Sequence, residues 1–273
     1  MDTSWIASAL NSVRDKRPLV HNITNYVVMN TTANALLALG ASPIMAHSPE
    51  ELEDLVKIAD AIVINIGTLD EKWIYSMLAA ARLAKDLNKP VILDPVGAGA
   101  TKLRTRTSLL LLDSGKISAV RGNYGEISAL LGEVGKTKGV DTAMYDKHRA
   151  GTIAYEVARK YNTVVSVTGP VDYVSDGKYI YEVFSGSSAL DSVIHHVTGL
   201  GCIVTSLIGA YLAVQDPLRA TISGLATFRV AAAKAAEESP YPGTFHTKIY
   251  DWLYRVTGED IIKSTKVSLF EPS

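Results

Sequence analysis

The sequence has little of three things that define large classes of proteins: cysteine, net charge and long apolar runs. Its 273 residues include one cysteine, Cys202, so no disulfide can form within the chain, which fits a reducing compartment. Its 27 basic and 28 acidic side chains nearly cancel, and this balance gives no electrostatic reason to expect nucleic acid or a membrane surface as a partner. It also has no run of about 20 apolar residues of the kind that spans a bilayer.

The first residues lack the basic start and the apolar block of a signal peptide. Together with the lone cysteine, this leads us to expect a cytoplasmic enzyme. The chain is 47% hydrophobic and long enough to bury a sizeable core. Because no repeat, low-complexity tract or linker divides it, we predict one domain over residues 1–273.

Short apolar segments alternate with longer helical ones along most of the chain. Buried parallel strands are predicted at residues 43–46, 61–66, 91–94, 117–120 and 164–168. Helices long enough for right-handed crossovers are predicted at residues 72–87 and 147–160. Asp176-Gly177 between two strand-like segments predicts a hairpin and an antiparallel edge. The expected fold is therefore α/β, with a mostly parallel central sheet flanked by helices.

The most informative segment is a glycine-rich loop, Thr198-Gly199-Leu200-Gly201-Cys202, which precedes an apolar helix predicted at residues 203–214. Glycines at a helix start let the backbone approach a ligand closely. The first amides of the helix have no partners within the helix, and its dipole favours an anion there. Taken alone, the pattern is explained equally well by a tight turn that feeds a core helix.

Two other glycine motifs do not meet the requirements for phosphate binding. Gly135-Lys136-Thr137 resembles the end of a P-loop, but Leu130 stands where the motif needs a glycine. The segment Gly97-Ala98-Gly99 follows a predicted strand, but Lys102 replaces the third glycine of a dinucleotide fingerprint.

Polar residues also gather where successive predicted strands end. Asp94, Arg121 and Thr168 each stand at or directly after the end of a buried run. In open α/β sheets, ligands bind at the carboxyl ends of the strands. We therefore expect these residues and the glycine loop to form one site.

Together these motifs resemble the ribokinase-like superfamily and, within it, the hydroxyethylthiazole kinase family. The likeness covers nearly the whole chain and is carried by His21-Asn22-Ile23-Thr24-Asn25, Asp94-Pro95-Val96-Gly97-Ala98-Gly99, the Asn-x-x-Glu of Asn123 and Glu126, the block from Thr168 to Gly177, and the glycine loop. The cysteine that closes the loop and the His-Asn-Ile-Thr-Asn segment are the specific part. Leu200 departs from the family, where a small or hydroxyl residue is expected.

The resemblance implies a ribokinase-like fold without a lid domain and an enzyme that forms homotrimers with sites between subunits. It implies transfer of the γ-phosphate of ATP to the hydroxyl of 4-methyl-5-(2-hydroxyethyl)thiazole, in thiamine biosynthesis or salvage, with Mg²⁺ as cofactor. It places Arg121 and Thr168 at ATP, and Met45 and Gly199 at the thiazole. Asn25 fits a hydrogen bond to a heteroaromatic nitrogen, or the N-cap of a helix predicted at residues 26–39.

Three interpretations of Cys202 follow from the residues around it. It is a small buried residue at a helix start, a nucleophile activated by His195 or His196, or the group that faces the substrate hydroxyl. The resemblance favours the third, at a position where related kinases carry an Asp base. A helix N-terminus lowers a thiol pKa, so a thiolate is expected here. The amides of Gly199 and Gly201 are then the anion hole that neutralises developing charge.

Two carboxylates are candidate magnesium ligands, because Mg²⁺ takes oxygen donors, often through water. Asp94 ends a strand and Glu126 lies at the start of a helix predicted at residues 126–131, so helix capping for Asp94 and an exposed face for Glu126 are the alternatives. Rival functions are a kinase of another small alcohol such as a hydroxymethylpyrimidine, a nucleotide-dependent dehydratase of hydrated nicotinamide cofactors, and a non-catalytic thiazole or nucleotide binder.

Overall fold

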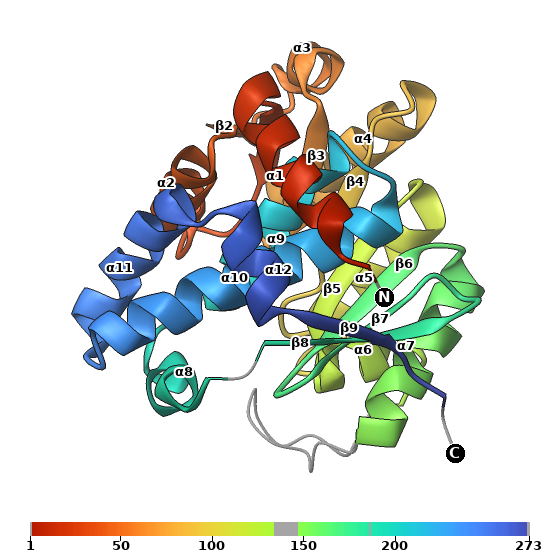
Figure 1. Ribbon diagram of the computed structural model, residues 1–273. Coiled ribbons are helices and arrows are strands. Elements are labelled where there is room, and N and C mark those ends of the chain that lie inside the picture. The colour runs from red at the N-terminus through yellow and green to blue at the C-terminus, as the bar shows by residue number, and fades with distance from the viewer. Residues whose placement is uncertain (1, 134–146, 186, 272–273) are drawn as a thin grey trace.

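The computed structural model describes residues 2–133, 147–185 and 187–271, and its centre is one twisted sheet (Figure 1). In the described part of the chain the sheet has nine strands in the order β2-β1-β3-β4-β5-β6-β7-β8-β9. The strands from β2 to β6 are parallel; they are β2 (Ser42–Met45), β1 (Leu19–Ile23), β3 (Ala61–Asn65), β4 (Val91–Asp94), β5 (Ala119–Asn123) and β6 (Val164–Thr168). The segment Gly135-Lys136-Thr137 lies outside the described residues.

The antiparallel part of the sheet begins with the predicted hairpin, which forms from β7 (Asp172–Ser175) and β8 (Ile180–Phe184). Asp176 Oδ1 accepts hydrogen bonds from the amides of Lys178 and Tyr179 and so shapes the turn. The prediction that this hairpin forms the antiparallel edge of the sheet is wrong. Strand β9 (Lys266–Leu269) pairs antiparallel with β8 and takes that place.

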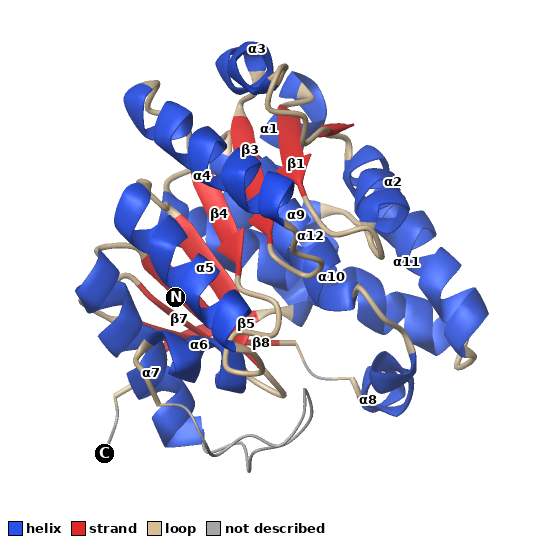
Figure 2. Ribbon diagram, turned by 180° about the vertical axis from the view of Figure 1, so that it is seen from behind, coloured by secondary structure: helices blue, strands red, loops and turns tan. Residues whose placement is uncertain are grey.

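Helices cover both faces of the sheet, as the two opposite views show (Figures 1 and 2). Those that pack into the core of one face are α1 (Ser4–Lys16), α2 (Met29–Leu39), α8 (Ser188–Val193), α9 (Leu200–Leu212), α10 (Pro217–Glu238), α11 (Pro242–Arg255) and α12 (Gly258–Ser264). A short 3-10 helix, η1 (Ile194–His196), follows α8. Those of the other face are α3 (Leu52–Ile58), α4 (Glu71–Asp86), α5 (Lys102–Ser114), α6 (Tyr124–Leu130) and α7 (Lys147–Tyr161).

The two hydrophobic cores follow from the two-residue period of the strands. In β3, Val63 belongs to the core shared with α9 and α10, whereas its neighbours Ile62 and Ile64 belong to the core on the opposite face. All five residues of β3 are buried, which explains why the parallel strands read as continuous apolar runs.

Two elements differ from the sequence-based expectation. Strand β1 was not predicted, because His21 and Asn22 interrupt its apolar pattern although both are buried. Helix α2 begins at Met29 rather than at residue 26, since the amides of Tyr26 and Val27 donate to the side chains of Thr68 and Asn25. Asn25 therefore does not cap α2, whose N-cap is Val28.

No single helix in the described ranges is both long and apolar enough to cross a membrane. Only a pair bent by 108°, residues 188–196 with 200–212, satisfies that length and composition test, and then only when its two parts are combined.

Candidate active site

The carboxyl ends of the parallel strands meet the N-terminus of α9 at one edge of the sheet. Asn65 is the last residue of β3, Asp94 is the last residue of β4, and Asn25 follows β1 by two residues. Cys202 lies in the first turn of α9 and contacts the two asparagines. Segments that are 177 positions apart in the chain are thus joined by one hydrogen-bond network.

Asn65 is the centre of this network. Its Nδ2 donates to Asp94 Oδ2 at 3.0 Å and to Cys202 Sγ at 3.1 Å. Its Oδ1 accepts from Asn25 Nδ2 at 2.7 Å and from the amide of Gly67 at 3.0 Å. Both hydrogens of its amide nitrogen and both lone pairs of its amide oxygen are used in these hydrogen bonds, so the orientation of the amide is fixed. Sequence reasoning missed Asn65, although a polar residue that ends an apolar strand is the signal that would have found it.

The thiol of Cys202 is not the thiolate that the helix N-terminus led us to expect. Burial raises the pKa of Cys202 from 9.0 to about 12, and the negative charge of Asp94 adds to the rise. Hydrogen bonds from Asn65 and Asn25 and the charge of Arg121 oppose this effect without reversing it. The dipole effect is therefore smaller than the cost of desolvating a thiolate.

No histidine activates this thiol in the described structure. The hydrogen-bond partners of Cys202 Sγ are Asn65 and Asn25, whereas His195 and His196 lie in η1 before the loop. This arrangement gives no support to a protease-like nucleophile, which requires a hydrogen-bonded base.

Asp94 is fully buried, and one of its two carboxylate oxygens has no partner. Its Oδ2 accepts from Asn65 and from Thr205 Oγ1 at 2.8 Å, while Oδ1 has no hydrogen-bond partner in the described structure. Burial raises the pKa of Asp94 from 3.8 to about 6; Arg121 lowers it and Glu126 raises it. A buried carboxylate oxygen without a donor calls for an explanation, and a ligand bound at the site provides one.

Glu126 and Asn123 form a capping box at the start of α6. Glu126 Oε2 accepts from the Asn123 amide at 2.8 Å, and the Asn123 side chain accepts from the Glu126 amide at 2.9 Å. Glu126 Oε1 accepts from the amide of Gly97 at 2.9 Å, which ties the loop after β4 to the loop after β5. Glu126 is thus 7% exposed rather than on an open surface, and its carboxylate already has a structural role.

These residues fit a magnesium ion only in part. The described residues contain no group of three or more His, Cys, Asp or Glu side chains that could hold a metal. Mg²⁺ bound with nucleotide phosphates keeps several waters and needs only one or two carboxylates. The unpartnered oxygen of Asp94 suits such a site, and each Glu126 oxygen retains one lone pair for a water.

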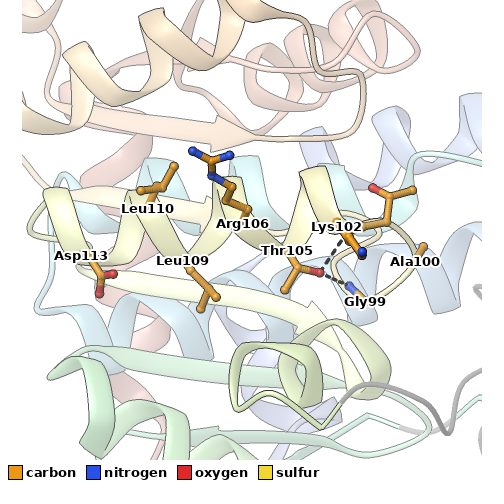
Figure 3. Close-up of a pocket in the computed structure, with 9 residues that line it drawn as sticks. Gly99, Ala100, Lys102, Thr105, Arg106, Leu109, Leu110 and Asp113 are labelled. Carbon is orange, nitrogen blue, oxygen red and sulfur yellow. Dashed lines mark hydrogen bonds between the residues drawn. The ribbon is translucent and has the colours of Figure 1, made fainter.

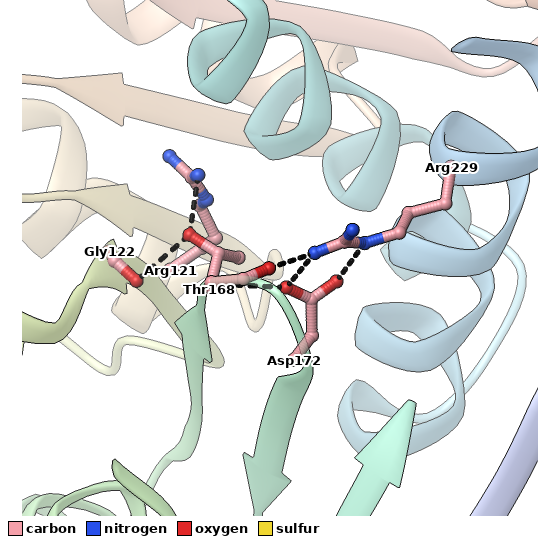
Figure 4. Close-up of polar contacts among 6 residues, drawn as sticks. Arg121, Gly122, Thr168, Asp172 and Arg229 are labelled. Atoms are coloured by element: carbon pink, nitrogen blue, oxygen red, sulfur yellow. Dashed lines mark hydrogen bonds and ion pairs between the residues drawn. The ribbon is translucent and has the colours of Figure 1, made fainter. Parts of the chain in front are cut away.

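Arg121 hydrogen-bonds to the predicted nucleotide residue Thr168 (Figure 4), and its guanidinium lies against Gly201 of the glycine loop. Its Nη2 donates to Thr168 Oγ1 at 2.6 Å, and Thr168 Oγ1 donates to the Gly122 carbonyl at 3.2 Å. A Cβ atom at Gly201 would overlap the guanidinium, lying 2.9 Å from Arg121 Nη2 and 3.0 Å from Cζ. The lack of a side chain at position 201 therefore allows a permanent positive charge to lie against the first turn of α9.

Gly199 is the N-cap of α9, with φ +83 in the left-handed region. A Cβ at this position would lie 2.9 Å from Val28 Cγ1. Leu200 is 6% exposed and belongs to the hydrophobic core on the α9 side of the sheet. This departure from the family pattern therefore points its side chain into the core, away from any anion at the helix start.

Met45 comes from the edge strand of the sheet. It ends the edge strand β2 opposite Asn22 of β1, and its side chain is half-buried rather than part of the core. The ring of His21 hydrogen-bonds through Nε2 to the Ala46 carbonyl at 2.9 Å and so fixes the residue that follows Met45. Nearby in the chain, Tyr26 stacks on Trp73 with ring centroids 4.4 Å apart while remaining 63% exposed.

A hollow of about 540 Å³ lies along α5, beside this site (Figure 3). Its lining runs from Gly99 through Thr105 and Arg106 to Asp113. None of the predicted catalytic, nucleotide or substrate residues lines it, so the hollow does not replace the strand-end site as the candidate active centre.

Known proteins resemble this chain over nearly its whole length. The model of the hydroxyethylthiazole kinase family matches residues 10–259. The hydroxyethylthiazole kinase of Pyrococcus furiosus is 60% identical over 97% of this chain and 98% of its own length. That of Methanococcus vannielii is 59% identical over the same shares.

The chain belongs to the hydroxyethylthiazole kinase family. A solved structure of hydroxyethylthiazole kinase from Pyrococcus horikoshii OT3 matches with a TM-score of 0.89 and 54% identity, covering 98% of this chain and 99% of that one. The pyridoxal kinase of Staphylococcus aureus shares the fold at 18% identity, with a TM-score of 0.60 over 79% of this chain and 87% of its own. The expected ribokinase-like α/β fold and the expected enzyme class, a kinase, are thereby confirmed.

Proposed function

We propose that this protein transfers the γ-phosphate of ATP to the hydroxyl of 4-methyl-5-(2-hydroxyethyl)thiazole, giving the thiazole phosphate used to make thiamine phosphate. The observation that carries the proposal is the meeting of Arg121, Cys202 and the start of α9 at the carboxyl edge of the sheet, in a chain of this family. A fixed cation, a helix N-terminus and a polar group for the alcohol are the parts that phosphoryl transfer requires.

In this proposal, the residues that bind ATP are Arg121, Thr168 and the glycine loop. The guanidinium of Arg121 always carries its charge and presents several donors to phosphate oxygens. Gly199 and Gly201 leave the first amides of α9 free of side chains, so these amides act as an anion hole for the charge that develops in the transition state.

The alcohol end belongs to Cys202, with Asn25, Met45 and Gly199 at the thiazole ring. With a pKa of about 12, the Cys202 thiol stays protonated at neutral pH. It therefore positions the substrate hydroxyl and does not act as its base. Asn25 Nδ2 already donates a hydrogen bond to Asn65 Oδ1. Its position at the thiazole ring is therefore set by the hydrogen-bond network that it shares with Asn65.

Mg²⁺ would be held near Asp94 and Glu126, where it supplies charge neutralisation for the phosphates. Asp94 would use the oxygen that has no protein partner, and Glu126 would act through water. Glu126 also fixes the loop at Gly97, whose amide donates to Glu126 Oε1.

We further propose a cytoplasmic homotrimer with its sites between subunits. The described residues include no lid over the strand ends, so water has to be excluded from the site in another way. Tyr26 and Val27, next to Asn25, are each 63% exposed, and a neighbouring subunit would cover such apolar side chains.

The test is incubation of the purified protein with ATP, Mg²⁺ and a panel of small alcohols that includes hydroxyethylthiazole and a hydroxymethylpyrimidine. We expect hydroxyethylthiazole phosphate as the main product, identified by mass. Preferential phosphorylation of the pyrimidine would favour the first rival. ATP-dependent dehydration of a hydrated nicotinamide cofactor with no phosphorylated alcohol would favour the lyase, and no reaction with any of them would favour a binding protein.

A further inference from the structure

A buried ion pair joins α10 to the turn that follows β6 (Figure 4). Arg229 of α10 donates from Nε to Asp172 Oδ2 and from Nη2 to Asp172 Oδ1, each at 2.8 Å. Asp172 is 1% exposed and the Arg229 side chain is 13% exposed. The two-bond geometry fixes the relative orientation of both side chains as well as their distance.

The same two side chains hold both polar atoms of the Gly169 backbone. Asp172 Oδ1 accepts from the Gly169 amide at 3.1 Å, and Arg229 Nη2 donates to the Gly169 carbonyl. Gly169 is a residue with an unusually free backbone and no side chain to anchor it. The ion pair therefore sets the course of the chain between the end of β6 and the start of β7.

The residue directly before Gly169 is Thr168, whose hydroxyl accepts a hydrogen bond from Arg121. Arg121 Nε is buried without a partner in the described structure, so the guanidinium is held by few bonds of its own. Its place against Gly201 depends on Thr168, and the place of Thr168 depends on the turn that Arg229 and Asp172 hold.

We propose that Arg229 and Asp172 are positioning residues for nucleotide binding, acting through the Gly169 turn and Thr168 on the Arg121 guanidinium. This inference rests on the proposed function, since it takes Arg121 and Thr168 to bind ATP. It gives α10, which carries none of the residues proposed above to bind ATP or the alcohol, control over the position of the Arg121 guanidinium.

A purely structural tie between α10 and the sheet predicts something different. Removal of that tie would lower the melting temperature and leave the affinity for ATP unchanged in the folded protein. Arg14 of α1 provides a matched control, because its Nη2 donates to the carbonyls of Leu253, Tyr254 and Val256 at 3.2, 3.0 and 2.9 Å. It is another partly buried arginine that holds backbone, and its partners, which also include the Leu39 carbonyl at the end of α2, lie on helices and just after α11 rather than at the strand ends.

The experiment compares Arg229→Met, Arg229→Lys and Arg14→Met with the wild type, using calorimetry of ATP binding, steady-state kinetics and thermal unfolding. We expect both methionine variants to melt at lower temperature. Only Arg229→Met should weaken ATP binding, by about ten-fold or more, with little change in KM for the thiazole alcohol. Arg229→Lys keeps the charge but not the two-bond geometry, so it should lie between wild type and methionine.

A double-mutant cycle with Thr168→Val tests the route of the effect. If Arg229 acts through Thr168, its replacement should weaken ATP binding much less in the Thr168→Val background than in the wild type. Unchanged ATP affinity in folded Arg229→Met, or additive losses in the double variant, would overturn the inference. If Arg229→Met does not fold, Arg229→Lys is tested in the same cycle and must show the same non-additivity. Because calorimetry needs no turnover, a wild type that binds ATP but does not phosphorylate the thiazole alcohol would overturn the proposed function alone.

Discussion

The guanidinium of Arg121 lies in the space that a side chain at Gly201 would fill. A Cβ at position 201 would be 2.9 Å from Nη2, a distance that real Cβ atoms essentially never show, and 3.0 Å from Cζ. The second glycine of the loop is therefore tied to a cation on a neighbouring strand. In the proposed function the loop and the strand form one anion-binding unit, and this proposal has consequences that can be measured.

Gly201→Ala should displace Arg121 and reduce kcat/KM by about 100-fold, the scale at which the loss of one preorganised charge-stabilising donor is felt. Gly201→Val should reduce kcat/KM further, because its side chain is larger. Gly243→Ala in α11 is the matched control, since a Cβ there meets no atom within 4 Å. Steady-state kinetics and thermal unfolding of the three variants show whether activity is lost in a protein that still folds. Near-normal turnover in a folded Gly201→Ala protein would contradict the assignment.

Cys202→Ser and Cys202→Asp should both remain active, because positioning by the loop amides survives and Asn65 still has an acceptor to donate to. Turnover and intact mass during the reaction are measured together. A thiol-linked adduct at Cys202 that forms and decays at the turnover rate would overturn direct transfer.

Cys202 should also react slowly with iodoacetamide at pH 7, and faster as the pH rises toward the thiol pKa of about 12. A small free thiol with an ordinary pKa serves as the control in the same solution. A Cys202 alkylation rate at pH 7 equal to that of the free thiol would contradict the raised pKa, and a faster rate would show that the site stabilises a thiolate.

Asp94→Asn should make the protein more stable at pH 7.5 while it impairs catalysis. The pKa of Asp94 is raised from 3.8 to about 6, so the folded state binds this proton more tightly than the unfolded state does. Stability is therefore lost as pH rises through this window, and the ionised carboxylate costs roughly 3 kcal/mol above it. Urea unfolding should show a higher free energy of unfolding for the variant than for the wild type at pH 7.5. Most of this difference should disappear at pH 4.5.

Asp113→Asn on α5, an exposed carboxylate, is the control for this measurement and should change stability little at either pH. An Asp94→Asn variant that is equally stabilised at both pH values, or that is destabilised at pH 7.5, would contradict the sign of the argument.

Light scattering on the purified protein should give about three times the chain mass. Activity per chain should then fall on dilution below the dissociation constant of the assembly, because each site needs a neighbour to exclude water. A monomer that is fully active at assay dilution would rule this arrangement out.

Much of the sheet could be predicted from the sequence, because a strand buried on both faces must be apolar throughout. Strands β3 and β4 match their predicted runs to within one residue for this reason. Strand β1 could not be predicted in this way. Its His21 and Asn22 are buried polar residues whose partners, Ala46 and Ser206, come from distant segments.

The candidate site shows the same division between local and tertiary information. The glycine loop, Asp94 and Thr168 were visible because strand ends and helix starts are local signals. The hub role of Asn65 and the pairing of Asp172 with Arg229, 57 positions away, exist only once the chain is folded. The expected thiolate at Cys202 was wrong for the same reason. The helix dipole can be inferred from the local sequence, whereas the burial that raises the pKa of the thiol arises only from the tertiary structure.

Helix α9 packs across β1, β3 and β4, although it follows the last of these strands by more than a hundred positions. During synthesis at 5–20 residues per second, on the order of ten seconds pass between the appearance of β4 and that of α9. Until then Val20, Val63 and Ile92 lack the contacts that Gly209 of α9 makes with them in the folded protein. The helix that carries the proposed anion hole is also the one that covers these side chains, so the binding site forms at the same step in which this apolar surface is buried.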